Sequence, residues 1–153
     1  MKYPFVIEKA PRNYAGFFPD IPGVATAKTK EELKERMAEV LALTLDELRA
    51  SAAAIPAPTP LDKLDVSEYE PEEPFEIAEV EPAPMNPVSL EIERAIRAAG
   101  LSESEVARRI GTSRAAMTRI TNPFYWGHSL STLHKLADAL GAQLEVSLRP
   151  RAA

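Results

Sequence analysis

Two carboxylates in the first third of the chain, Glu8 and Asp20, are the first candidates for chemistry. Asp20 lies in the string Phe18–Gly23, FPDIPG. A metal-dependent nuclease needs several convergent carboxylates around paired metal ions, and these two are too few. Neither histidine lies in this half to act as a general base. The string therefore favours a turn, in which prolines fix φ, Asp20 hydrogen-bonds the backbone ahead of it and Gly23 accepts a positive φ.

The composition argues against a metal centre elsewhere in the chain. The 153 residues include no cysteine and only two histidines, so disulfides and thiolate sites are excluded. There is no charged-then-apolar start and no apolar run of about 18 residues, so neither secretion nor a membrane span is supported. We therefore expect a cytoplasmic protein with no metal or cofactor.

The charge is divided unequally along the chain. Up to Met85 there are 9 Lys or Arg against 17 Asp or Glu, whereas from Asn86 onward there are 9 against 6. Arginine supplies eight of the nine cations in the second half. Two halves of opposite charge suggest two partners of opposite charge.

Proline marks the division between the halves. Residues 51–87 hold eight of the fourteen prolines, so a continuous helix cannot form there. One short strand, Phe75–Val80, is expected within this region. We predict a first domain over 1–81, a linker over 82–88 and a second domain over 89–149.

The first half has the pattern of an antiparallel meander covered by one helix, which is a small α+β layer. Thr29 and Glu32 form a capping box ahead of an apolar stripe at helical spacing. The predicted elements are strands at residues 2–9, 14–18 and 24–28 and a helix at residues 30–50.

The second half is predicted to be all-helical, with four short helices separated by turns. Each start has a Ser or Thr cap and several ends have a glycine. The predicted helices are Leu90–Ala99 after Ser89, Glu103–Ile110 after Ser102, a third from Thr112 or Ser113 to about Thr121, and a fourth opened by Ser129 or Ser131.

The second and third of these helices can form a helix-turn-helix. Their inward positions are apolar: Val106, Ala107, Ile110, Ala116, Met117 and Ile120. An outward Arg on the third helix could bind guanine O6 and N7 in the major groove. The alternative is an ordinary helical hairpin with solvated arginines. The DNA-binding candidates are Thr112, Ser113, Arg114, Ala115, Thr118 and Arg119.

A single strand is predicted after the last helix. Leu144, Val146 and Leu148 alternate with Gln143, Glu145 and Ser147. A lone strand leaves its backbone groups unpaired, and pairing with the same strand of a second chain would satisfy them. We therefore expect a homodimer through these six residues, with a tetramer left open.

Residues Ser102–Leu140 resemble the Cro/repressor-type helix-turn-helix, with ARRIGTSR matching its usual turn. Glu103 departs from the family, which often has a phosphate-contacting Gln there, so that contact is not expected here. The tail Ala137–Leu148 is similar to the end of the variant of this domain found on antitoxins.

The first half resembles the HicB antitoxin domain. The matching strings are YPFVIE, YAGFFPDIPGVAT, KEELKERMAEVLALTLDEL and IPAPTP. The resemblance implies a partial RNase H-like fold and binding to a HicA-type toxin, a small ribonuclease that cleaves mRNA. It also implies that the second half binds operator double-stranded DNA of the shared operon, as an autorepressor, and that the protein is not an enzyme.

The toxin-binding candidates are aromatic and acidic. Phe17 and Phe18 cannot both face one side of a strand, so an exposed aromatic is expected beside the turn. The seven Glu of residues 68–81 could lie on a basic toxin face, or form only a solvated linker. The full set is Tyr14, Phe17, Phe18, Asp20, Tyr69, Glu72 and Glu73.

The aromatics of Asn122–His128 are expected to pack onto the helices, with one of them at a dimer interface or on the DNA backbone as the alternative. His128 and His134 are expected to be surface or capping residues. Two rival functions stay open: an orphan repressor whose first domain senses a ligand, and a metal-dependent nuclease with a DNA-targeting tail.

Overall fold

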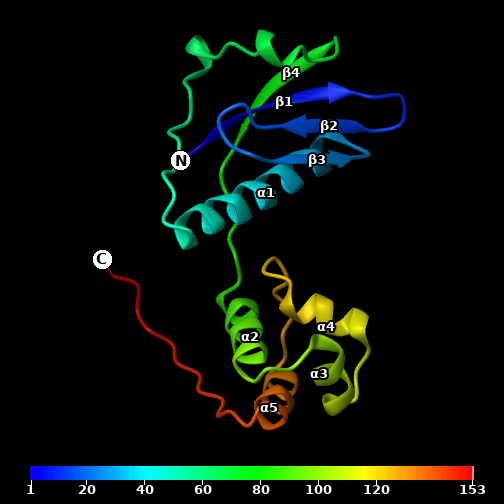
Figure 1. Cartoon of the computed structure of the whole chain (residues 1–153), viewed down its shortest axis with the longest axis vertical. Helices are drawn as coiled ribbons and strands as arrows, with labels where there is room; N and C mark the ends of the chain where they lie inside the picture. Colours follow the sequence, from blue (N-terminus) through cyan, green and yellow to red (C-terminus); the bar gives the residue numbers. More distant parts are fainter. Residues whose placement is uncertain (153) are drawn as a thin grey trace. The chain divides into compact units, whose positions relative to one another are not determined.

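The computed structural model describes residues 1–152 and divides into two compact units (Figure 1). The first unit, Met1–Pro84, contains a sheet and one long helix. The second unit begins at Met85 and is helical. The predicted class, an α+β unit followed by an all-helical one, is confirmed at this level.

The first unit is built on a four-stranded antiparallel sheet in the order β3-β2-β1-β4. Its three predicted strands and the strand predicted inside the proline-rich region all form. Their bounds are β1 Tyr3–Lys9, β2 Tyr14–Phe17, β3 Val24–Ala27 and β4 Phe75–Val80. The first strand lies at the centre because the fourth strand returns to pair with it.

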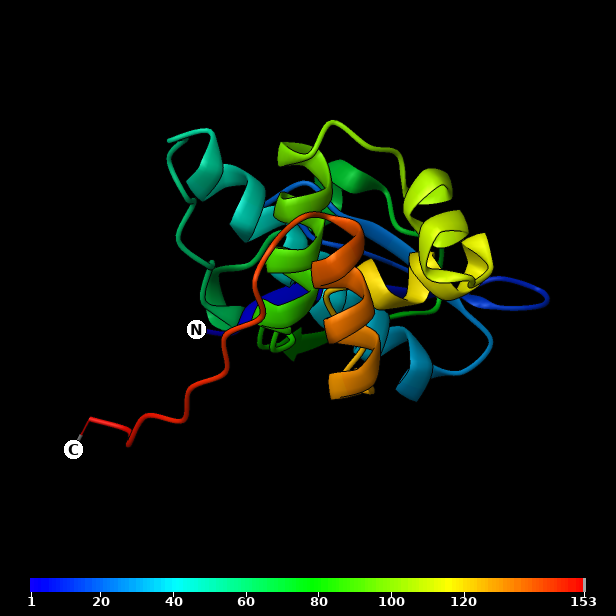
Figure 2. The same ribbon diagram turned by 90° about the horizontal axis from the view of Figure 1, so that it is seen from below.

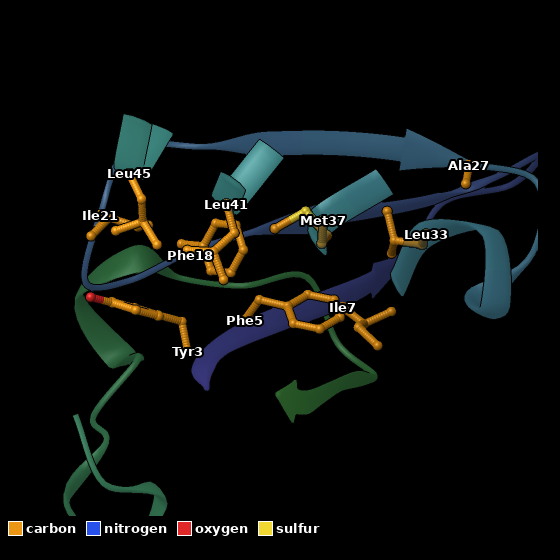
Figure 3. Close-up of a cluster of buried hydrophobic side chains, with 10 residues drawn as sticks. All are labelled: Tyr3, Phe5, Ile7, Phe18, Ile21, Ala27, Leu33, Met37, Leu41 and Leu45. Atoms are coloured by element: carbon orange, nitrogen blue, oxygen red, sulfur yellow. The ribbon is translucent and has the colours of Figure 1, made fainter. Parts of the chain in front are cut away.

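One face of this sheet is covered by α1, Lys30–Ala50. The side chain of Thr29 caps the helix by accepting a hydrogen bond from the backbone N–H of Glu32 at 3.1 Å. Figure 3 shows apolar side chains of the sheet meeting those of the helix. The core comprises Tyr3, Phe5, Ile7, Phe18, Ile21, Ala27, Leu33, Met37, Leu41 and Leu45.

Residues 51–74, which we name the return segment, lead from α1 to β4. They contain two short 3-10 turns, Leu61–Lys63 and Ser67–Tyr69. Figure 1 shows the segment running from the end of α1 past the start of β1. There the Tyr3 hydroxyl donates to the carbonyl of Pro56 at 2.7 Å. The segment is therefore bonded to the sheet.

The second unit contains four helices around a small apolar core. The helices are α2 Pro87–Ala98, α3 Glu103–Ile110, α4 Arg114–Thr121 and α5 Leu130–Ala139. The core residues are Ile92, Ile96, Val106, Ala107, Met117, Ile120 and Leu136. The four predicted helices are thus present.

The start of α2 differs from the prediction. Asn86, not Ser89, is the cap, and its side chain accepts from the backbone N–H of Val88 at 3.0 Å. Pro87 occupies the first helical turn, where a missing N–H costs nothing. Ser89 is fully buried inside the helix. The Asn-Pro pair was the sequence signal for this start.

Residues 143–148 form no strand within the described chain. Figures 1 and 2 both show the chain after α5 extending away from the helices. Leu144, Val146 and Leu148 are exposed. A strand that needs a second chain has no partner in one chain, so the dimerising strand stays a prediction.

Candidate nucleic-acid interface and partner-binding surface

The α3–α4 pair is set by local caps and one turn. Ser102 accepts from the N–H of Glu105, and Ser113 accepts from the N–H of Ala116, each at 3.1 Å. Gly111 ends α3 with φ of 71°, a left-handed conformation that suits glycine. Ser113 is therefore the cap, and Thr112 precedes it in the turn.

The outward side of α4 carries the predicted DNA-binding residues. Arg114, Ala115, Thr118 and Arg119 are exposed, as is the cap Ser113, whereas Thr112 is half-buried. Met117 and Ile120 point into the core. The predicted division of this helix into an inward and an outward face is present in the structure.

Arg114 and Arg119 differ from the arginines of α3 in their pairing. No carboxylate within residues 1–152 lies in salt-bridge range of either side chain. Arg108 and Arg109, in contrast, both bond Glu105, at 2.6 and 3.0 Å. The two guanidinium groups of α4 therefore keep all their donors for a ligand.

The charges of α3 are largely satisfied within the protein. Hydrogen bonds from Arg108 first, and then from Arg109, hold the pKa of the Glu105 carboxyl below its usual value. The carboxylate of Glu103 accepts from the Thr121 hydroxyl at 3.0 Å. Glu103 thus joins α3 to the end of α4. The Glu at this position, where the family often has Gln, therefore has a structural role.

Thr118 can make fewer hydrogen bonds to a ligand than its hydroxyl group alone would allow. Its hydroxyl donates to the carbonyl of Arg114 at 3.1 Å. The hydroxyl proton is therefore used inside the helix, and only the oxygen lone pairs remain for an external donor.

A hollow of about 260 Å³ lies beside α4. Cationic and hydroxyl side chains line it, among them Thr112, Arg119, Ser129, Thr132 and Lys135. Ser129 caps α5 by accepting from the N–H of Thr132 at 3.1 Å. These groups are suited to anionic oxygens.

His128 is half-buried and bonds the end of α4, so of its two predicted roles, surface or capping, the structure agrees with the capping one. Its Nδ1 lies 3.2 Å from Asn86 Nδ2, and its Nε2 lies 2.7 Å from the carbonyl oxygen of Ile120. Because the Asn86 oxygen caps α2, the Asn86 amide must donate to Nδ1, so Nε2 carries the proton. His128 thereby ties α2 to the end of α4.

The aromatics of the loop between α4 and α5 divide between the two predicted arrangements. The ring of Tyr125 lies 5.0 Å from that of His128, and its hydroxyl donates to the carbonyl of Gly127 at 3.0 Å. Trp126, however, is 60% exposed, so it does not pack onto the helices. His134 is exposed on α5 near Asp138, as expected of a surface histidine.

In the first unit, the prediction that Phe18 belongs to the toxin-binding surface is wrong. It is 5% exposed and packs in the core, with its ring 6.0 Å from that of Phe5. Tyr14 also packs against this core, and Lys30 Nζ lies 5.8 Å from its ring centre. Both side chains are part of the sheet–helix layer.

Phe17 lies on the other face of the sheet. The ring of Tyr69, from the return segment, packs against it with ring centres 5.4 Å apart and planes tilted by 45°. The Tyr69 hydroxyl donates to the carbonyl of Pro19 at 2.9 Å. Glu72 and Glu73 follow in the same segment with exposed side chains. The structure therefore brings together Phe17, Tyr69 and the acidic pair, without Tyr14 and Phe18.

Asp20 is structural, but it does not bond the backbone just ahead of it. Its two oxygens accept from the Thr59 N–H at 2.8 Å and the Thr59 hydroxyl at 2.6 Å. Glu8 accepts from the N–H of Glu72 at 2.7 Å. The two carboxylates considered first thus hold different parts of the return segment.

Comparison with known proteins identifies the second unit. Residues 91–145 match the family described as the Cro/C1-type HTH DNA-binding domain. The resemblance of this region to the Cro/repressor-type helix-turn-helix is confirmed. The second unit is a DNA-binding domain of this class.

The chain is also similar to one chain of a solved structure titled "HicA3 and HicB3 toxin-antitoxin complex". The identity is 27%, the TM-score is 0.44, and the match covers 53% of this chain and 96% of that one. No curated protein matches the chain. Within residues 1–152, no helix has both the length and the apolar character to cross a membrane.

Proposed function

We propose that this protein is a non-enzymatic antitoxin of the HicAB type, which neutralises a HicA-type ribonuclease and represses its own operon. The observation that carries the proposal is the exposed outer side of α4, where Arg114 and Arg119 have no carboxylate partner within residues 1–152. That helix belongs to the Cro/C1-type match. It is joined to an acidic unit with HicB-like motifs.

The DNA half would act as a dimer on a palindromic operator. Arg114 and Arg119 are the proposed base contacts, and Thr112, Ser113 and Thr118 would position the helix. The hollow beside α4 supplies cationic and hydroxyl groups for a neighbouring phosphate. Pairing of residues 143–148 between two chains would set the spacing of the two α4 helices.

The antitoxin half would bind the toxin and cover its active site. The FPDIPG string forms the β2–β3 turn, in which the N–H of Phe18 donates to the carbonyl of Gly23 at 3.1 Å. The negative charge of the first half favours a basic, RNA-binding partner. A partial RNase H-like fold and a cytoplasmic location belong to the same proposal.

The two activities can be tested separately. The full chain should shift DNA taken from upstream of its own reading frame, and not a scrambled duplex of equal length and composition. The proposal implies that a short reading frame encoding the toxin adjoins the frame of this chain. Expressing that neighbouring frame alone should stop growth, and co-expression of this chain should restore it. Operator binding without growth rescue would leave a repressor and refute the antitoxin assignment, and rescue without a DNA shift would refute autorepression.

A further inference from the structure

A continuous apolar row crosses the face of the sheet opposite α1. In the register, Val6 lies opposite Phe17 on one side and opposite Ile77 on the other, and Phe17 lies opposite Val24. Directly opposed residues of antiparallel strands point to the same face. This row, which we name the outer row, therefore draws one residue from each of the four strands.

The outer row is covered in the middle and open at both ends. Val6 is fully buried, and the ring of Tyr69 of the return segment packs against that of Phe17. Val24, in contrast, is 73% exposed and Ile77 is 40% exposed. These two positions are on the edge strands β3 and β4. The return segment thus leaves two apolar anchor points on either side of Tyr69.

Carboxylates surround the outer row. Glu8 and Glu79 point to the same face by the register, and the bonds of Tyr69 and Glu72 to the sheet bring the acidic return segment beside it. None of these carboxylates has a cation within salt-bridge range in residues 1–152. The set comprises Glu8, Glu68, Glu70, Glu72, Glu73 and Glu79.

We infer that the outer row with its acidic rim is the docking surface for a basic protein, which places an apolar contact on Val24 and Ile77 and cations against the glutamates. The inference rests on the proposed function and specifies the face through which the first unit binds its toxin. Charge selects this occupant. A nucleic acid would be repelled by the rim, and a second copy of the chain would bring the same acidic rim against it.

The test uses the full chain and the product of the adjacent short reading frame, with the dissociation constant measured by calorimetry. Val24→Arg introduces a cation and removes the apolar contact at an exposed position. Ile77→Arg is the second variant, in case the first does not fold. Leu43→Arg is the matched control, because Leu43 is an exposed apolar residue of α1, away from the outer row.

We expect Val24→Arg and Ile77→Arg to weaken the complex at least about tenfold, and Leu43→Arg to change it less than about twofold. Added salt should raise the dissociation constant of the complex with the parent chain, because it screens the attraction between the glutamates and the cations of the partner. Circular dichroism and operator binding, both unchanged, would show that the variants fold.

Three results would overturn the inference. If the parent binds and both outer-row variants bind equally well, the docking face is elsewhere although the antitoxin function stands. If Val24→Arg alters the oligomeric state of the free chain, the occupant is a second copy. If the parent chain does not bind the neighbour at all, the proposed function fails and this inference fails with it.

Discussion

The two units assemble their exposed surfaces in different ways. The outward side of α4 comes from eight consecutive residues, and its position depends on the serine caps and the Gly111 turn. The outer row takes single residues from four strands. The return segment lies over it and is held there by the hydrogen bonds of Asp20 to Thr59 and of Tyr69 to Pro19. The outward surface of α4 is therefore formed by residues that are neighbours in the sequence. The outer row of the sheet is formed by residues that are far apart in the sequence and meet only in the folded unit.

The cores of the two units differ in size and in how far the helices depend on their caps. The first has one set of large, fully buried side chains between sheet and helix, including Tyr3, Phe5, Leu33, Met37 and Leu41 (Figure 3). The second has a smaller core and relies on a cap at the start of each helix. Substitutions that disturb one unit alone can therefore separate their contributions.

The largest effect is expected from Phe5→Ala. Removing this fully buried ring should destabilise the first unit by about 3–5 kcal/mol. Differential scanning calorimetry should show that unit's transition lost or strongly lowered, while operator binding persists. Leu61→Ala, at an exposed site, is the control. Equal loss of DNA binding would mean that the two units do not fold separately.

A smaller effect is expected from Arg114→Ala in α4. It should weaken operator binding by about 1–3 kcal/mol and relax the preference at one base position. Quantitative gel shifts with single-base operator variants measure both. Arg94→Ala, in α2, removes an exposed arginine outside α4 and should leave binding unchanged. If Arg114→Ala binds operator and scrambled DNA like the parent, α4 is not the reading helix.

Asp20→Asn tests the bond that holds the return segment. The amide cannot accept from both Thr59 donors, so the first unit should lose about 1–3 kcal/mol. Urea unfolding followed by circular dichroism measures the loss. Asp46→Asn, an exposed site on α1, serves for comparison. Equal stability of the two variants would show that the Thr59 contact is dispensable.

Ser102→Ala tests the N-terminal cap of α3 in the second unit. Loss of the cap on Glu105 N–H should cost about 1 kcal/mol of that unit's stability. Ser104→Ala removes a hydroxyl from an exposed position in the same helix and should have little effect. Thermal unfolding of both variants gives the answer, and a larger loss at Ser104 would contradict the assigned cap.

The smallest effect concerns the Glu105 carboxyl, whose folded pKa is lowered by Arg108 and Arg109. The stabilising contribution of this carboxylate should be fully present above its unfolded pKa and lost as pH falls through the lower folded pKa. The difference in thermal midpoint between the parent and Glu105→Gln should therefore shrink on acidification. A difference independent of pH would mean that the charge of Glu105 is irrelevant.

The sequence predicted what depends on neighbouring residues. The Thr29 cap and the apolar stripe placed α1 at its observed bounds, and Gly111 marked the turn before α4. The face of Phe18 was not predictable, because the turn after β2 sends it into the core with Phe5. Neither was the Asp20–Thr59 contact, since it joins residues 39 apart.

The outer row depends on the strand register. Val24 and Ile77 carry no local signal that they lie on one face, because their relation passes through β1 and β2. The partners of His128 were not predictable for a similar reason, because they come from the start of α2 and the end of α4. Contacts of this kind are set by topology and cannot be found from spacing alone.

The central claim is best tested by co-purification with the neighbouring reading frame. The chain is co-expressed with that product, only the neighbour carries a tag, and the eluate is assayed for both proteins and for RNA cleavage. We predict a stable complex that does not cleave RNA, with cleavage appearing when the tagged protein is freed from this chain. A tagged neighbour that elutes alone, while the helix-turn-helix unit still binds DNA, would contradict the antitoxin assignment.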